Sequence, residues 1–226
     1  RDSVSMQHNK SYLITDSLDY DRDKNLIYYF EGGRMYDGDN RLRSQWGYYY
    51  TETYDYYAVE GVVLKNPDYS ITSDTLRYNT ESEIADFFGP TEIVSDSNYL
   101  YCEYGRYNTV TDEANLTKNA WLQSGSNYLY GDSLYYDRKI RFGEGFLNVS
   151  IIDTSNNMIA SGNYGYFYEE PERAFMTDST LLTYVMDGDS LFIHADTIFI
   201  TTEKQGDTLD FKLMRAFHKV LAFKSD

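Results

Sequence analysis

The chain has 226 residues, of which 42% are hydrophobic, so it can bury a sizeable core in one elongated domain or two small ones. Its 36 acidic and 20 basic residues give a formal net charge of −16, and the basic residues form no stripe along the sequence. DNA and anionic membrane surfaces are therefore disfavoured as partners. The single cysteine, Cys102, excludes a disulfide framework and cysteine-based metal sites.

The first ten residues, RDSVSMQHNK, are polar, and we expect residues 1–10 to form a tail before a single β-repeat domain over residues 11–226. They hold no signal-peptide core, so an exported form would have lost its leader. No apolar run reaches the roughly 18 residues that a membrane-spanning helix needs. The 25 tyrosines and 12 phenylalanines, with only 3 prolines, suit pleated, half-buried strands.

From residue 15 onward a short pattern recurs: a small residue, a polar one, any residue, Leu or Gly, any residue, and an aromatic one, with weaker copies toward the C-terminus. The copies are TDSLDY (15–20), SQWGYY (44–49), SDTLRY (73–78), CEYGRY (102–107), GDSLYY (131–136), GNYGYF (162–167) and ADTIFI (195–200). The first four intervals are 29 residues each, followed by 31 and 33. So regular a spacing predicts a repeat-built fold.

A second feature keeps the same period. Apolar segments built around a Gly or an Asn recur as FEGGRM (30–35), VEGVVL (59–64), FFGPTEI (87–93), LTKNAWL (116–122) and FLNVSI (146–151). Turn residues such as Asn66-Pro67-Asp68 separate the segments. Each unit of about 29 residues is therefore predicted to contain two strands, and the fold class to be all-β.

Side-chain parity changes inside each copy. Ile71 and Ser73 share one face of a strand, whereas Leu76 and Tyr78 have the opposite parity. If all of them point inward, the strand must bulge or bend between them. We place this bend at the polar residue in the second position of each copy, which is Asp16, Gln45, Asp74, Glu103, Asp132, Asn163 or Asp196. Repeated bends turn a flat sheet into a V-shaped trough or a flattened roll.

The bend is predicted to enclose an apolar trough. Small residues would line one crease and leave room in it: Thr15, Ser44, Ser73, Cys102, Gly131, Gly162 and Ala195. The inward-facing residues that we expect to contact a lipid are Ile71, Leu76, Tyr78, Leu100, Tyr107, Leu129, Leu134, Tyr136, Val149 and Ile151. The alternative interpretation of the same residues is a packed sandwich core without a ligand.

The C-terminal part departs from the regular period. TTEKQGDTLD (201–210) is an insertion, and residues 211–223 fit either a helical stripe or another strand pair, of which we favour the strand pair. Ser225-Asp226 matches the start of a further copy. We therefore expect the sequence to be part of a longer protein.

The repeat resembles that of the OstA-like family, which includes LptA- and LptC-type proteins of periplasmic lipopolysaccharide transport. The segments SDTLRYNTESEIADFFGPTEI (73–93) and GDSLYYDRKIRFGEGFLNVSI (131–151) are similar to the family's unit. The resemblance covers roughly residues 11–200 and extends to RAFHKVLAFKSD (215–226). It implies an antiparallel β-jelly-roll, or folded sheet. It also implies a periplasmic bridge that carries lipopolysaccharide toward the outer membrane, with acyl chains in the trough and other OstA-like proteins joined end to end by strand addition.

No residues are singled out for catalysis, a metal or a cofactor. His8, His194 and His218 lie far apart in the sequence, and we interpret them as structural. The recurring acidic residues follow the repeat, which favours bulge or turn capping over a glycosidase pair of carboxylates. Two other functions stay open: a structural or adhesive cell-surface repeat protein with a dry core, and a carbohydrate-active β-sandwich.

Overall fold

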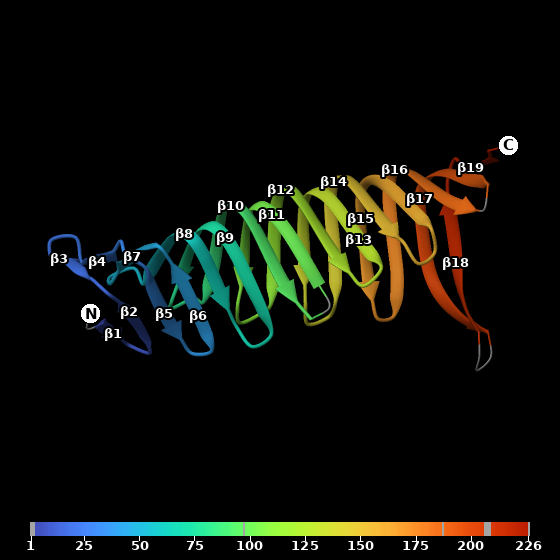
Figure 1. The fold of residues 1–226 in the computed structure, drawn as a ribbon. Helices are drawn as coiled ribbons and strands as arrows, with labels where there is room; N and C mark the ends of the chain where they lie inside the picture. The colour runs from blue at the N-terminus through green and yellow to red at the C-terminus, as the bar shows by residue number, and fades with distance from the viewer. Residues whose placement is uncertain (1–2, 97, 187, 206–208, 226) are drawn as a thin grey trace. The chain divides into compact units, whose positions relative to one another are not determined.

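The computed structural model describes residues 3–96, 98–186, 188–205 and 209–225, and in this part of the chain every regular element is a β-strand. Its antiparallel strands divide into two compact units, residues 1–112 and 113–226. Figure 1 shows successive strands of each unit lying side by side and joined by turns. The all-β folded-sheet prediction is confirmed.

The first unit contains short strands followed by long ones. They are β1 (Val4–His8), β2 (Ser11–Thr15), β3 (Asp19–Asp21), β4 (Leu26–Tyr29), β5 (Gly33–Asp37), β6 (Asn40–Ser44), β7 (Trp46–Tyr50), β8 (Asp55–Lys65), β9 (Tyr69–Asn79), β10 (Ile84–Ser95) and β11 (Asn98–Asn108). Residues 1–10, predicted as a tail, thus contain a strand, because β1 pairs with β2 along its length.

The second unit consists of long strands and a divided last pair. They are β12 (Glu113–Ser124), β13 (Asn127–Asp137), β14 (Phe142–Asp153), β15 (Met158–Glu169), β16 (Glu172–Met186), β17 (Asp189–Gln205), β18 (Leu209–Phe217) and β19 (Leu221–Lys224). Residues 211–217 and 221–223 therefore lie in two strands joined by residues 218–220, the strand pair that was favoured from the sequence. Residues 206–208 of the predicted insertion, and Asp226 of the predicted further copy, lie outside the described residues.

Each long strand is interrupted by a register break that divides it into two arms. Between β9 and β10 the pairing passes from Phe88↔Thr75 to Thr91↔Ser73, which leaves Asp74 outside the regular register. Where the strands are short, the division is complete: β2, β5 and β6 belong to one arm, arm A, and β3, β4 and β7 belong to the other, arm B. Both arms meet in β8, which pairs with β6 and with β7.

Pairs of consecutive residues with left-handed backbone conformation lie at the bend on the strand next to the polar residue. The pairs, all with positive φ, are Glu60-Gly61, Lys118-Asn119, Leu147-Asn148, Asp178-Ser179 and His218-Lys219. Left-handed conformation costs a non-glycine residue about 1–2 kcal/mol, so the surrounding pairing must hold these pairs in place. Backbone hydrogen bonds do so from strand to strand, for example from Gln45 N to Glu60 O (2.9 Å).

The core of each unit lies between the two arms. The aromatic residue that ends each copy of the repeat is buried at Tyr49, Tyr78, Tyr107, Tyr136 and Phe167. Tyr20, predicted to share this position, is 55% exposed. It lies on β3, a three-residue strand that pairs with β4, so in the described residues β3 is an edge strand of arm B.

Candidate functional site

The ten residues predicted to face a lipid all lie in the apolar core, and none is more than 6% exposed. They come from both arms. Ile71, Leu100, Leu129, Val149 and Ile151 lie on arm A, and Leu76, Tyr78, Tyr107, Leu134 and Tyr136 lie on arm B. The structure thus gathers them within each unit as two facing apolar surfaces.

The five residues predicted at the bend lie at or beside the register breaks. Asp132 accepts a hydrogen bond from Nδ2 of Asn148, 2.9 Å away, which belongs to the left-handed pair of the next strand. Asp196 lies 3.4 Å from Nζ of Lys219, again a left-handed residue. A Cβ atom added at Gly89 would come within 3.0 Å of Cβ of Asp74, so Asp74 lies close to this glycine. Asp16 and Glu103 occupy equivalent places between β2 and β3 and within β11. Asp132 and Asp196 therefore contact the left-handed pairs at the bend, outside the core.

Large side chains occupy the crease that was expected to leave room for a ligand. A Cβ atom added at Gly162 would come within 2.8 Å of Cγ of Met176, and one added at Gly131 would come within 3.0 Å of Leu134. Ser73 and Thr91 fill the crease with a hydrogen bond of 2.8 Å between their hydroxyls. In the described part of each unit, the small residues therefore accommodate neighbouring side chains.

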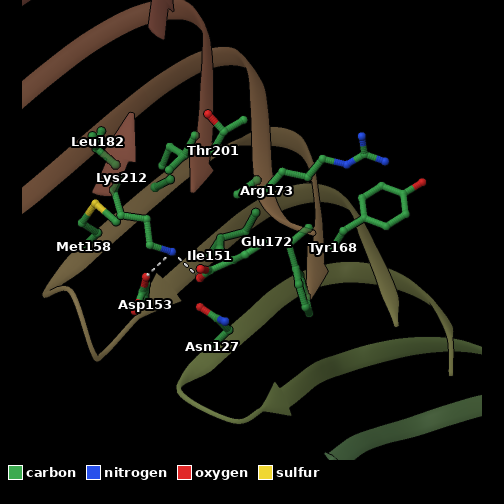
Figure 2. Close-up of a pocket in the computed structure, with 14 residues that line it drawn as sticks. Asn127, Ile151, Asp153, Met158, Tyr168, Glu172, Arg173, Leu182, Thr201 and Lys212 are labelled. Atoms are coloured by element: carbon green, nitrogen blue, oxygen red, sulfur yellow. Dashed lines mark ion pairs between the residues drawn. The ribbon is translucent and has the colours of Figure 1, made fainter. Parts of the chain in front are cut away.

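A hollow between the arms of the second unit has a volume of about 30 Å³. Figure 2 shows it, with Ile151, Met158 and Leu182 among its apolar lining. The corresponding hollow in the first unit, beside Leu13, Met35 and Tyr56, has about 10 Å³. A water molecule needs about 10–15 Å³ of such volume, so each hollow has room for a few waters at most and not for an acyl chain as the arms now lie.

Polar side chains lie along the edge of the arms opposite the bend, which we call the rim. At the mouth of the second unit's cavity, Nζ of Lys212 on β18 forms ion pairs with Glu172 on β16 and with Asp153 on β14, the latter at 3.5 Å. Figure 2 shows the lysine reaching across between these two carboxylates. Asp153 belongs to arm A and the other two to arm B, so this cluster joins the arms.

A second rim cluster joins the arms of the first unit. Tyr78 of arm B donates a hydrogen bond to Oδ2 of Asp37 in arm A (3.1 Å) and accepts one from Nδ2 of Asn40 (3.2 Å). The other oxygen of Asp37 accepts a hydrogen bond from the Ser11 hydroxyl (2.9 Å). Burial, together with the neighbouring Asp37 carboxylate, raises the pKa of Tyr78 well above its usual value.

In the second unit Tyr136 occupies the position equivalent to Tyr78. Its hydroxyl lies 3.4 Å from Oε1 of Glu169, and the same carboxylate accepts a hydrogen bond from Ser124 in arm A. Burial and the negative charge of Glu169 raise the pKa of Tyr136. The terminal aromatic residue of the repeat therefore has two roles here: its ring fills the core, and its hydroxyl reaches the rim.

We expect Tyr78→Phe to lower the free energy of unfolding by about 1–3 kcal/mol, because it leaves the buried Asp37 and Asn40 without a partner that spans the arms. Urea denaturation followed by circular dichroism measures the change. Tyr107→Phe is the matched control, since the Tyr107 hydroxyl donates to Asp112 in the turn that follows its own strand (2.9 Å). Equal losses in the two variants would contradict a special role for the rim hydroxyl.

The remaining candidate groups are separate from one another. Within the described residues, no three or more His, Cys, Asp or Glu side chains gather as they would around a metal ion. Burial raises the pKa of Cys102 to about 12. His8 stacks on Tyr54, and His218 lies in the bend between β18 and β19. No helix in the described chain is long and apolar enough to cross a membrane.

The rim clusters were not predicted from the sequence. Apart from the tyrosines, Lys212 and two glutamates, their members are turn-flanking Asp, Asn and Ser residues. Such side chains also cap turns, so their spacing carries no separate signal. One sign was present: the copies at 73–78 and 131–136 end in Tyr, whose hydroxyl needs a partner when the ring is buried.

Two arms of antiparallel sheet, joined at a repeated bend and packed around an apolar interior, define a repeat-built folded-sheet protein. The family profile described as OstA-like protein matches residues 1–74 and 79–189, so the chain belongs to the OstA-like family. The resemblance found in the repeat is thereby confirmed.

Among solved structures, the chain is similar to LptH from Pseudomonas aeruginosa, described as the LptA homologous periplasmic component of the conserved lipopolysaccharide transport device. The identity is 15%, the TM-score is 0.41, and the match covers 43% of this chain and 75% of LptH. A search of curated proteins finds no match.

Proposed function

We propose that this protein is a periplasmic, non-enzymatic component of lipopolysaccharide transport that holds the acyl chains of the lipid between its two arms and passes the lipid toward the outer membrane. Membership of the OstA-like family carries this proposal. The two apolar surfaces that face each other within each unit support it, because they supply the kind of contact that an acyl chain needs.

Lipid entry requires the arms to separate. The interior is filled, so an acyl chain must replace contacts between the arms with contacts to itself. Burial of each CH₂ group contributes about 0.8 kcal/mol, and the loss of arm–arm burial offsets much of that gain. A nearly balanced exchange gives reversible binding, which transport along a series of proteins requires. Opening of the rim clusters adds the cost of breaking the polar contacts of Tyr78 and Lys212.

The partners that we propose are other OstA-like proteins, joined end to end. Within the described residues, β1 pairs with β2 alone, and β18 and β19 pair with β17 alone. Each therefore presents an edge with backbone N–H and C=O groups available for strand addition.

Site-specific photo-crosslinking in cells tests lipid binding. A photoreactive residue is placed at Leu76 or Leu134, which are 0% and 1% exposed on the inner faces, and the protein is then examined for lipopolysaccharide adducts. The control is Arg77, the neighbour of Leu76, whose side chain points outward to Asp55 and Asp86. We expect adducts at the two leucine positions and none at the arginine position.

Adducts absent from both inner positions, in variants whose circular dichroism shows an intact sheet, would contradict the proposal. They would favour the second candidate, a structural or adhesive repeat protein. One observation supports that candidate, namely that the interior is already filled by side chains.

A further inference from the structure

Four basic side chains lie together on the outer face of arm A in the first unit, although no stripe of basic residues was found in the sequence. Arg34 on β5 lies directly opposite Arg43 on β6, and Arg41 on β6 lies directly opposite Lys65 on β8. Opposite residues of an antiparallel pair project from the same face. The register therefore forms a group from residues that are up to 31 positions apart, which we call the basic patch.

These four cations are unpaired, unlike many others in the protein. Within the described residues, none of them has a carboxylate within 4.0 Å, whereas Arg77, Arg106 and Lys212 each contact at least one. In a chain with 36 acidic residues, the absence of counter-ions at four adjacent cations is notable. Like charges directly opposite each other also destabilise a sheet, and the patch contains two such pairs.

The patch surrounds a hollow of about 240 Å³. Its lining is Arg34, Met35, Tyr36, Arg41, Leu42, Arg43, Val63 and Lys65, which includes four cations and no carboxylate. Tyr36 stacks on Tyr12 with ring centroids 4.7 Å apart and planes 8° apart, so one side of the hollow is a flat aromatic surface. A neighbouring hollow toward the bend shares Arg34 and Arg43, but it also contains Asp16, Glu31 and Glu60.

We propose that the basic patch binds a phosphorylated saccharide, with phosphate oxygens held by Arg34, Arg41, Arg43 and Lys65. Guanidinium groups bind phosphate through paired hydrogen bonds, and a bound anion removes the repulsion within both like-charged pairs. The hollow is somewhat smaller than a typical drug-sized pocket, which suits a single phosphorylated sugar.

This inference deepens the proposed function and rests on it for the source of the ligand, the phosphorylated headgroup of a glycolipid. A soluble phosphate compound would present the same chemistry. The experiment therefore compares a lipid with a soluble phosphate.

Isothermal titration calorimetry of the whole chain is carried out with three probes: bis-phosphorylated lipid A in detergent micelles, its dephosphorylated counterpart, and inorganic pyrophosphate. The variants are Arg34→Gln/Arg43→Gln and Arg41→Gln/Lys65→Gln. Each removes one like-charged pair, so we expect each variant to be at least as stable as the parent protein. The control Arg22→Gln/Lys24→Gln removes the same charge from the exposed turn between β3 and β4.

We expect each patch variant to bind phosphorylated lipid A at least about tenfold more weakly than the parent protein, with unchanged binding of the dephosphorylated lipid. Pyrophosphate binding that depends on the patch, without binding of either lipid, would support the site and contradict the proposed lipid transport. Equal binding of the phosphorylated probes by parent and patch variants, or an equal loss in the control, would overturn the site.

Discussion

Above about pH 10 the folded protein is expected to lose stability steeply and to unfold cooperatively. Four tyrosines have rings that are no more than 2% exposed and pKa values raised mainly by burial: Tyr29, Tyr56, Tyr78 and Tyr136. In the unfolded chain each ionises near its ordinary pKa of about 10. The folded state keeps these protons to higher pH, so its stability is fully present below pH 10 and falls as the pH rises toward the raised values.

The size of the effect follows from the number of groups. Once the unfolded chain has lost its phenolic protons, each buried tyrosine removes about 1.4 kcal/mol of stability per pH unit. A protein with a typical stability of 5–15 kcal/mol would then unfold within roughly one to three pH units. Absorbance of tyrosinate and far-ultraviolet circular dichroism, recorded together from pH 8 to 13, measure the transition.

Tyr56→Phe tests the cause, because it removes one fully buried phenol and keeps the ring. We expect a shallower loss of stability with pH. Tyr20→Phe, at a position that is 55% exposed, should leave the dependence unchanged. A gradual, non-cooperative titration of all tyrosines near pH 10, with the sheet intact, is the result that this explanation does not allow.

Much of the fold could be predicted because the repeat imposes one rule at every copy. The strands β8, β10, β12 and β14 begin at residues 55, 84, 113 and 142, at the same interval of 29 that was found in the sequence. Period-2 parity also placed Ile71 and Leu76 on surfaces that are buried together. Both signals are local, so they do not depend on which strands become neighbours.

The construction of the bend was only partly predictable. The acidic residue at the bend could be found in the sequence because it recurs. The left-handed pair beside it could not, because its residues vary between copies, from Glu60-Gly61 to Leu147-Asn148. What these pairs share is a backbone conformation, and only a Gly or an Asn hints at it in sequence. The first repeats show the same limit, because there the bend separates whole strands such as β6 and β7.

The candidate sites outside the core depend on register between strands that are distant in sequence. Arg41 lies opposite Lys65 only because β6 pairs with β8, although β7 lies between these two strands in the sequence. Tyr78 meets Asp37 only because the arms fold onto each other. Composition and spacing describe one strand at a time, so they could not reveal either arrangement. They also could not show whether the space between the arms is empty or filled, because this depends on how side chains of different copies interlock.

Gly33→Ala and Gly47→Ala are each expected to lower the free energy of unfolding by about 3 kcal/mol or more, at the upper end of the effect of overpacking a core. A Cβ atom added at either glycine would overlap the ring of Tyr29. The ring cannot move aside easily, because it is 1% exposed and its hydroxyl is hydrogen-bonded to Ser44 (2.6 Å) and to Tyr56. Urea denaturation of the single variants measures the loss.

A double-mutant cycle separates this clash from other effects of the substitution. Leucine at position 29 keeps an apolar side chain but lacks the ring atoms that an added Cβ atom would meet. In the Tyr29→Leu background, Gly33→Ala should therefore be neutral or should stabilise the protein, since alanine restricts the unfolded chain more than glycine does. If Gly33→Ala costs the same in both backgrounds, the ring is not the cause, and the packing of the first unit around Tyr29 must differ from the arrangement described above.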